Sequence, residues 1–181
     1  FTSNVADVAL AAHWLRTHHQ PPSLVLGHSL GGTAALAATA EIPEAGAVVT
    51  VGSPADPAHL THLFAGVIPE VEETGSAEVV LAGQRLQITR SFVDDLRQQA
   101  PRDTVAALER PLLILHSPQD QLVELENANH LYRAAQHPKS FISLDGADHL
   151  LTRPRDAARV AQLVAAWAAP YLPDTFTPEI D

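Results

Sequence analysis

The chain has 181 residues, of which 46% are hydrophobic, so it can bury the core of one compact domain. Its formal net charge is −10 and its 11 Lys and Arg residues are scattered, which argues against nucleic acid or an anionic membrane surface as a partner. The absence of Cys excludes disulfides, thiolate metal ligands and cysteine nucleophiles. No stretch is typical of a signal peptide, an anchor or a bilayer-spanning helix, and we therefore expect a cytoplasmic protein.

The chain begins within a helical pattern. Val5, Val8, Ala12 and Leu15 recur at the spacing of one helix face. Because the chain also contains no Met, we expect it to be the remainder of a longer product, and therefore N-terminally incomplete.

Short apolar runs and helical patterns alternate through most of the remaining sequence. The runs are continuous, which is typical of strands in a parallel sheet that is buried on both faces. They lie at residues 23–26, 47–51, 112–116 and 140–144. The helical patterns lie at residues 31–40, 125–135 and 155–167. This alternation predicts an α/β fold with a mostly parallel sheet flanked by helices.

Residues 56–110 interrupt the alternation. Two Pro-Ala steps, at residues 54–55 and 57–58, mark the start of this segment, and it contains the charged stretch EVEETGSAE and a hairpin pattern, EVVLAGQRLQI, with its turn near Gly83. We expect this segment to be a cap insertion that lies over the strand ends. The chain would then divide into a first core segment, 1–55, the cap, 56–110, and a second core segment, 111–181.

The stretch LVLGHSLGG, residues 24–32, places one serine among glycines between a predicted strand and a predicted helix. A strained strand-turn-helix elbow needs small neighbours, and Gly27 and Gly31 would let the backbone approach closely while Ser29 Oγ stays exposed. The alternative is a glycine-rich turn in which Ser29 only caps the helix. The flanking strand and helix favour a nucleophile.

A serine nucleophile needs a base, and the base needs an acid that orients it. Asp120 follows the apolar run of LLILHSPQDQLV, and His149 follows the run of SFISLDGADHLL. Ser29, Asp120 and His149 therefore each lie just past the carboxyl end of a predicted strand, where ligands bind in open α/β sheets. Their order along the chain, serine, acid, histidine, is the one that a nucleophile elbow predicts.

Other residues compete for these roles. Asp56 also follows a strand, and Asp145 and Asp148 are close to His149 in sequence. An acid so near the histidine along the chain would have difficulty in reaching Nδ1 while Nε2 faces the serine, which favours Asp120.

The remaining histidines are assigned to packing or to solvent. His28 and His116 lie at strand ends, where local hydrogen bonds are expected, and five others fall on helix faces or loop tips: His13, His18, His19, His130 and His137. His59 and His62, three residues apart, could bind a metal, but no further ligand pattern surrounds them. We expect neither a metal nor a cofactor.

Six segments together resemble the hydrolase half of bacterial proteins in which an α/β hydrolase is fused to an OsmC-like domain. They are SNVADVALAAHWL, LVLGHSLGGTAAL, VGSPADPAHLTHLF, AEVVLAGQRLQI, HSPQDQLVELENA and HPKSFISLDGADHLL. The resemblance implies that Ser29, Asp120 and His149 form a catalytic triad and that the peptide N–H of Leu30 is an oxyanion donor. The OsmC-like half and the family's N-terminal strands, which carry the second oxyanion donor, are absent from this sequence.

The sequence thus predicts a serine carboxylic-ester hydrolase for small to medium acyl esters. We expect its substrate pocket to be lined by His28, Leu60, Phe64 and Val67. A thioesterase or peptidase with the same triad, and a non-catalytic hydrolase-like binding domain, are the alternatives. If the strands keep the family's order, strand 23–26 has a bare edge, and we expect a homo-oligomer to form through it.

Overall fold

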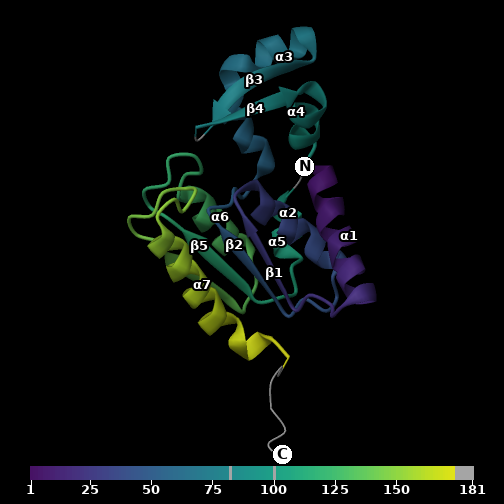
Figure 1. Ribbon diagram of the computed structural model, residues 1–181, viewed down its shortest axis with the longest axis vertical. Helices are drawn as coiled ribbons and strands as arrows, with labels where there is room; N and C mark the ends of the chain where they lie inside the picture. Colours follow the sequence, from purple (N-terminus) through teal and green to yellow (C-terminus); the bar gives the residue numbers. More distant parts are fainter. Residues whose placement is uncertain (82, 100, 174–181) are drawn as a thin grey trace, which may run out of the picture.

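The structure is a computed structural model, and it describes residues 1–81, 83–99 and 101–173. Its main sheet has four strands in the order β1-β2-β5-β6, and every neighbouring pair is parallel. The strands are β1 (Leu24–His28), β2 (Ala47–Val51), β5 (Leu112–His116) and β6 (Lys139–Ser143). The predicted α/β fold is confirmed, and the predicted strands agree with these to within two residues at each end (Figure 1).

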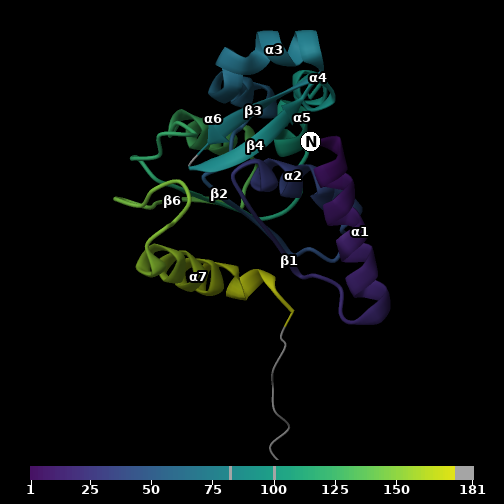
Figure 2. The ribbon, with the colours of Figure 1, turned by 45° about the horizontal axis from the view of Figure 1, so that its top comes forward.

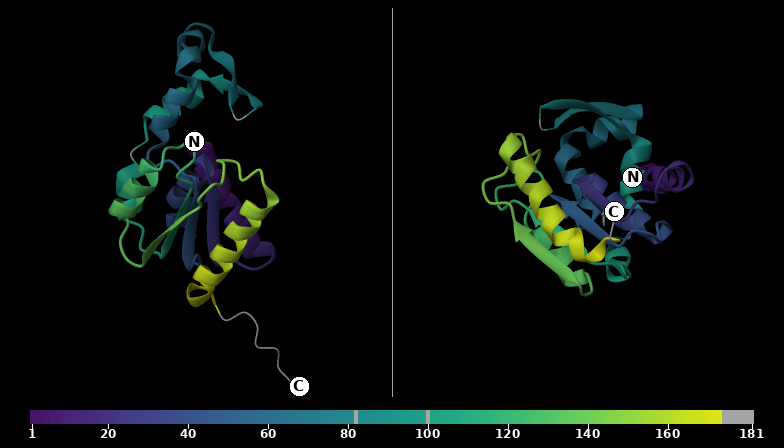
Figure 3. Two further views of the ribbon diagram at one scale, coloured as in Figure 1. Left: turned by 90° about the vertical axis from the view of Figure 1, so that its left-hand side faces the viewer. Right: turned by 60° about the horizontal axis from the view of Figure 1, so that its bottom comes forward.

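Helices cover both faces of this sheet (Figure 3). The helices of the core are α1 (Thr2–His18), α2 (Leu30–Ala38), α5 (Pro101–Ala106), α6 (Glu126–Ala134) and α7 (Pro154–Ala168). One face packs Val25 against α1 and α2, and Val48 and Ile114 against α2, α5 and α6. The other face packs against α7 through residues such as Val49 and Leu113. Residues 39–41 and 169–171 add single 3₁₀ turns after α2 and α7.

Residues 57–97, which lie between β2 and β5, form a smaller layer above the carboxyl ends of the strands (Figure 2). It consists of the 3₁₀ segment η2 (Pro57–Val67), α3 (Ile68–Thr74), β3 (Ser76–Leu81), β4 (Gln84–Thr89) and α4 (Arg90–Arg97). Strands β3 and β4 pair antiparallel, and Gly83 has a φ of +78°, which glycine adopts without steric cost. The predicted hairpin and its turn are therefore confirmed.

This layer has its own apolar cluster. Phe64, Val71, Ile88 and Leu96 are each at most 5% exposed, and they pack together with Ala34 of α2. The layer is thus attached to the helix that follows the nucleophile candidate. Among the residues that the structure describes, no helix is both long and apolar enough to cross a membrane.

Candidate active site

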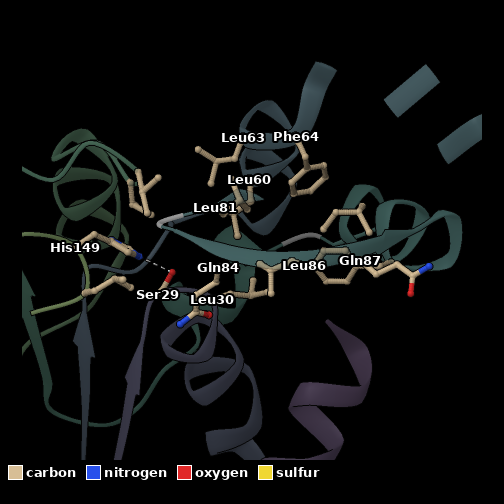
Figure 4. A pocket seen from close by; sticks show the side chains of 15 residues that line it. Ser29, Leu30, Leu60, Leu63, Phe64, Leu81, Gln84, Leu86, Gln87 and His149 are labelled. Carbon is tan, nitrogen blue, oxygen red and sulfur yellow. Dashed lines mark hydrogen bonds between the residues drawn. The ribbon is translucent and has the colours of Figure 1, made fainter. Parts of the chain in front are cut away.

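Ser29 lies at the turn between β1 and α2, with a φ of +53° that few non-glycine residues adopt. Its backbone N–H donates to the carbonyl oxygen of Val51 on β2 at 2.8 Å, which ties the turn to the neighbouring strand. Backbone strain of this kind is typical of functional positions that the surrounding structure holds in place. The turn leaves the Ser29 hydroxyl facing the space beneath the β3–β4 layer (Figure 4).

The glycines that permit this turn differ in part from those expected. A β-carbon on Gly27 would overlap the carbonyl group of Gly31, and one on Gly32 would overlap Ser53 Oγ. A β-carbon on Gly31 would meet no atom within 4 Å. The expectation that Gly31 is needed for close approach is therefore wrong. Gly32 is the glycine that needs to lack a β-carbon, because Ser53 lies against it.

His149 lies within hydrogen-bond distance of both Ser29 and Asp120. Ser29 Oγ is 3.0 Å from His149 Nε2, and His149 Nδ1 is 2.7 Å from Asp120 Oδ2. A carboxylate can only accept, so Nδ1 carries the proton and Nε2 has a free lone pair that faces the serine hydroxyl. This arrangement can remove a proton from Ser29 and stabilise the imidazolium that results.

Asp120 is held in its ionised form. Its other oxygen, Oδ1, accepts the backbone N–H groups of Leu122 and Val123, both at 2.9 Å. Burial raises the pKa of Asp120, but the hydrogen bonds from His149, Val123 and Leu122 together outweigh burial, so the pKa lies below its ordinary value. The carboxylate therefore stays charged at neutral pH, beside the imidazole that it orients.

The competing acids are occupied elsewhere. Asp56 Oδ1 accepts the N–H of Ala58 and so caps the η2 segment. Asp145 accepts the hydroxyl of Ser143, and Asp148 accepts the N–H of Thr152 at 3.0 Å. None of the three has a hydrogen bond to His149, in contrast to Asp120.

Two loops beside Ser29 are tied together, and the sequence offered no signal for this. Ser117 Oγ, in the loop that carries Asp120, donates to the carbonyl oxygen of Ala147 at 2.6 Å. Gly146 N–H, in the loop that carries His149, donates to Gln119 Oε1 at 2.6 Å. These contacts set the distance between acid and base, because each lies within three residues of one of them.

His28 and His116, at the ends of β1 and β5, each hydrogen-bond to a backbone carbonyl in the surrounding packing, as expected. His28 Nε2 is 2.7 Å from the carbonyl oxygen of His149, and the fully buried His116 has its Nε2 2.8 Å from the carbonyl oxygen of Val123. His62 Nδ1 contacts the carbonyl oxygen of His59, and His59 faces Asp56 at 3.8 Å. The described residues contain no group of three or more His, Asp or Glu placed to hold a metal ion.

A cavity of about 400 Å³ opens beside Ser29 and His149. Its walls come from η2, from the inner face of the β3–β4 hairpin and from the loops after β5 and β6, and they include Leu60, Leu63, Phe64, Leu81, Gln84, Leu86, Leu122 and Leu150 (Figure 4). Of the four residues expected to line the substrate pocket, Leu60 and Phe64 lie in this lining. His28 and Val67 do not: His28 is bonded to the loop that carries His149, and Val67 packs into the apolar cluster of the upper layer.

Leu30, the expected oxyanion donor, is also part of this lining. Leu30 is the first residue of α2 and lines the cavity beside Ser29. The first N–H groups of a helix have no intrahelical acceptor, so they are available to an oxygen that carries negative charge. The role of this amide as an oxyanion donor stays a prediction.

Comparisons with known proteins were made on sequence and on structure. A scan against protein-family models and a search of curated proteins returned no match. Among solved structures, the esterase domain of a Rhodothermus marinus protein is 44% identical, with a TM-score of 0.79, and the match covers 93% of this chain and 69% of that one.

Two more distant structures share the fold. Est1E from Butyrivibrio proteoclasticus is 17% identical with a TM-score of 0.69, over 92% of this chain and 68% of that one. The mouse alpha/beta hydrolase domain-containing protein 10 is 19% identical with a TM-score of 0.70, over 92% of this chain and 70% of that one. At such identities the likeness concerns the fold alone.

Proposed function

The chain belongs to the α/β-hydrolase family, and on this premise we propose that it is a serine carboxylic-ester hydrolase for small to medium acyl esters. The observation that carries the proposal is the continuous hydrogen-bond path from Ser29 Oγ through His149 to Asp120 at the wall of an apolar cavity. The 44% identity to an esterase domain supports the same reaction class. No step of the proposed reaction requires a cofactor.

In the proposed reaction Ser29 Oγ attacks the ester carbonyl carbon while His149 Nε2 takes the hydroxyl proton. The carbonyl oxygen becomes an oxyanion, and the N–H of Leu30 donates to it. His149 then gives its proton to the leaving alcohol oxygen as the C–O bond breaks, which leaves an acyl group on Ser29. Water, deprotonated by His149, attacks this acyl-enzyme and releases the acid and the free serine.

The cavity supports the proposed substrate class. Among the described residues, its lining contains no Asp, Glu, Lys or Arg side chain, so it favours a neutral acyl group over an anionic one. Its volume of about 400 Å³ is at the small end of ligand sites, which favours short or medium acyl groups over long lipids. Under this proposal residues 57–97 of the predicted segment 56–110 act as the cap, because Leu60 and Leu86 come from them, whereas Val105 and Leu108 at the end of the segment pack into the core.

A covalent probe and a substrate panel test the proposal. A fluorophosphonate should label the protein once, at Ser29, and Ser29→Ala should abolish both the label and the hydrolysis of p-nitrophenyl acetate and butyrate. Labelling or turnover that persists in Ser29→Ala would contradict the assignment. Matched thioester and anilide substrates belong in the same panel, since faster turnover of either would instead make the protein a thioesterase or a peptidase. A protein that neither reacts nor turns over would be a binding domain.

A further inference from the structure

We propose that His28 is a positioning residue for the reaction proposed above, and that it acts by holding the backbone of His149 rather than by touching the substrate. Its ring nitrogen Nε2 lies 2.7 Å from the carbonyl oxygen of His149. A carbonyl oxygen only accepts, so Nε2 must carry a hydrogen and donate. The residue next to the nucleophile thus binds the residue that activates the nucleophile.

His149 is contacted at two places, its ring and its main chain, by two consecutive residues of the β1–α2 turn. Ser29 Oγ is 3.0 Å from the ring of His149, and His28 binds its main chain. Residues 28 and 29 are themselves fixed, because β1 pairs with β2 through His28 opposite Val51 and Ser29 N–H donates to the Val51 carbonyl. A shift of the His149 backbone relative to the serine would therefore break the His28 contact first.

The other ties of the base loop come from a different side. Ser117 and Gln119 hold Ala147 and Gly146 to the loop that carries Asp120. Those contacts set the base relative to the acid, whereas the His28 contact sets the base relative to the nucleophile. The loop needs such support, since Leu151, two residues after the base, has a left-handed φ of +52°.

The charge state of His28 suits this task. Burial lowers the pKa of His28, and this effect exceeds the opposing effect of the hydrogen bond to the His149 carbonyl. The charged or titratable groups that face its ring are His149, whose ring centroid is 4.9 Å away, and Asp120. A neutral His28 donates its hydrogen bond without placing a second positive charge beside the imidazolium that forms on His149 during the reaction.

Two amide variants separate this role from simple packing. The side-chain nitrogen of Gln reaches about as far as His Nε2, whereas that of Asn stops near the position of Nδ1, so only His28→Gln can keep the bond to the carbonyl. We expect His28→Gln to retain kcat for p-nitrophenyl butyrate within about 3-fold. We expect His28→Asn to lose on the order of 10 to 10²-fold in kcat, with KM changed less than about 2-fold, as misplacement of a catalytic group does.

Two controls accompany the His28 variants. Thermal unfolding of both variants checks that each is folded, and His130→Asn, an exposed histidine on α6, should leave kcat unchanged. Equal kcat values for His28→Gln and His28→Asn, or a loss that appears in KM alone, would overturn the positioning role. A wild-type protein without Ser29-dependent hydrolysis would overturn the proposed function itself, and that result is seen before the variants are compared.

Discussion

Gly52 packs directly against Asp120: a β-carbon on Gly52 would lie 3.3 Å from Asp120 Oδ2, and 3.4 Å from His149 Nδ1. The backbone at the end of β2 therefore covers the hydrogen bond between acid and base. Gly52 also has a φ of +56°, so a substituted residue would be strained as well as crowded.

Gly52→Ala should consequently slow the reaction. We expect kcat for p-nitrophenyl butyrate to fall about 10-fold or more, because Asp120 and His149 must shift to make room and misplaced catalytic groups lose rate steeply. Gly66→Ala is the matched control, since a β-carbon there meets no atom within 4 Å. Steady-state kinetics of both variants measure the effect, and equal rates would show that the pair tolerates the added methyl group.

The acid is tested by removing its charge and keeping its shape. Asp120→Asn should lower kcat on the order of 10⁴-fold, because an amide in that place favours the wrong tautomer of His149. Asp148→Asn, which alters a carboxylate bonded to Thr152 instead, should have little effect. A near-normal rate in Asp120→Asn, together with a collapse in Asp56→Asn, would assign the acid to the end of β2.

The same carboxylate links stability to pH. Its pKa is lowered in the folded protein, so its contribution to the free energy of unfolding is complete above the unfolded pKa of about 4 and is lost as the pH falls through the folded value. Urea unfolding between pH 7 and pH 3 should therefore show a steeper loss of stability for the wild type than for Asp120→Asn. Asp7→Asn, on the exposed side of α1, should keep the wild-type slope.

Gln84 is a polar position on the apolar inner face of the hairpin. It pairs with Leu81 at the start of β4 and alternates with Leu86 and Ile88, which also line the cavity, and Figure 4 places it close to Ser29 and Leu30. Gln87 lies farther from Ser29 and donates to Ser76 Oγ at 3.1 Å.

We predict that the Gln84 amide favours acyl groups that carry a hydroxyl group near the ester. The ratio of kcat/KM between methyl 2- or 3-hydroxyhexanoate and methyl hexanoate should fall about 2- to 10-fold in Gln84→Leu, the range of one neutral hydrogen bond. Gln87→Leu should leave the ratio unchanged. If the wild type shows no preference for either hydroxy ester, Gln84 has no part in specificity.

The exposed edge of β1 predicts that the chain associates with a second copy of itself. β1 is an outer strand in the sheet that the described residues form, and Leu26 on it is 48% exposed. An apolar edge invites pairing with a second copy of the chain. We expect light scattering to give a mass above that of the monomer, and Leu26→Lys to lower it. Val80→Lys, at a residue 60% exposed on the hairpin, is the control. A concentration-independent monomer in the wild type would exclude this association.

Much of the architecture could be predicted from the chain alone because it depends on neighbours in sequence. The apolar runs of β2 and β5 are uninterrupted, which is typical of strands buried on both faces of a sheet. Their predicted ranges agree with the structure residue for residue. Ser29, Asp120 and His149 could be chosen because each lies a few residues past the carboxyl end of a strand, β1, β5 and β6 respectively. In a parallel sheet all carboxyl ends meet at one edge, so local position was sufficient to predict their proximity.

Contacts between distant segments were decided only by the tertiary structure. Gly31 and Gly32 are alike in the sequence, but a β-carbon on Gly32 would meet Ser53, in the loop after β2, and the carbonyl oxygen of Gly27, so only the second glycine is obligatory. His28 was expected both in the local packing and in the pocket. It is held in the packing, because the loop that carries His149, 121 residues later, brings the His149 carbonyl to its ring. Such contacts depend on strand register and loop conformation. No short stretch of sequence specifies them, because the groups that meet come together only when the sheet and its loops are assembled.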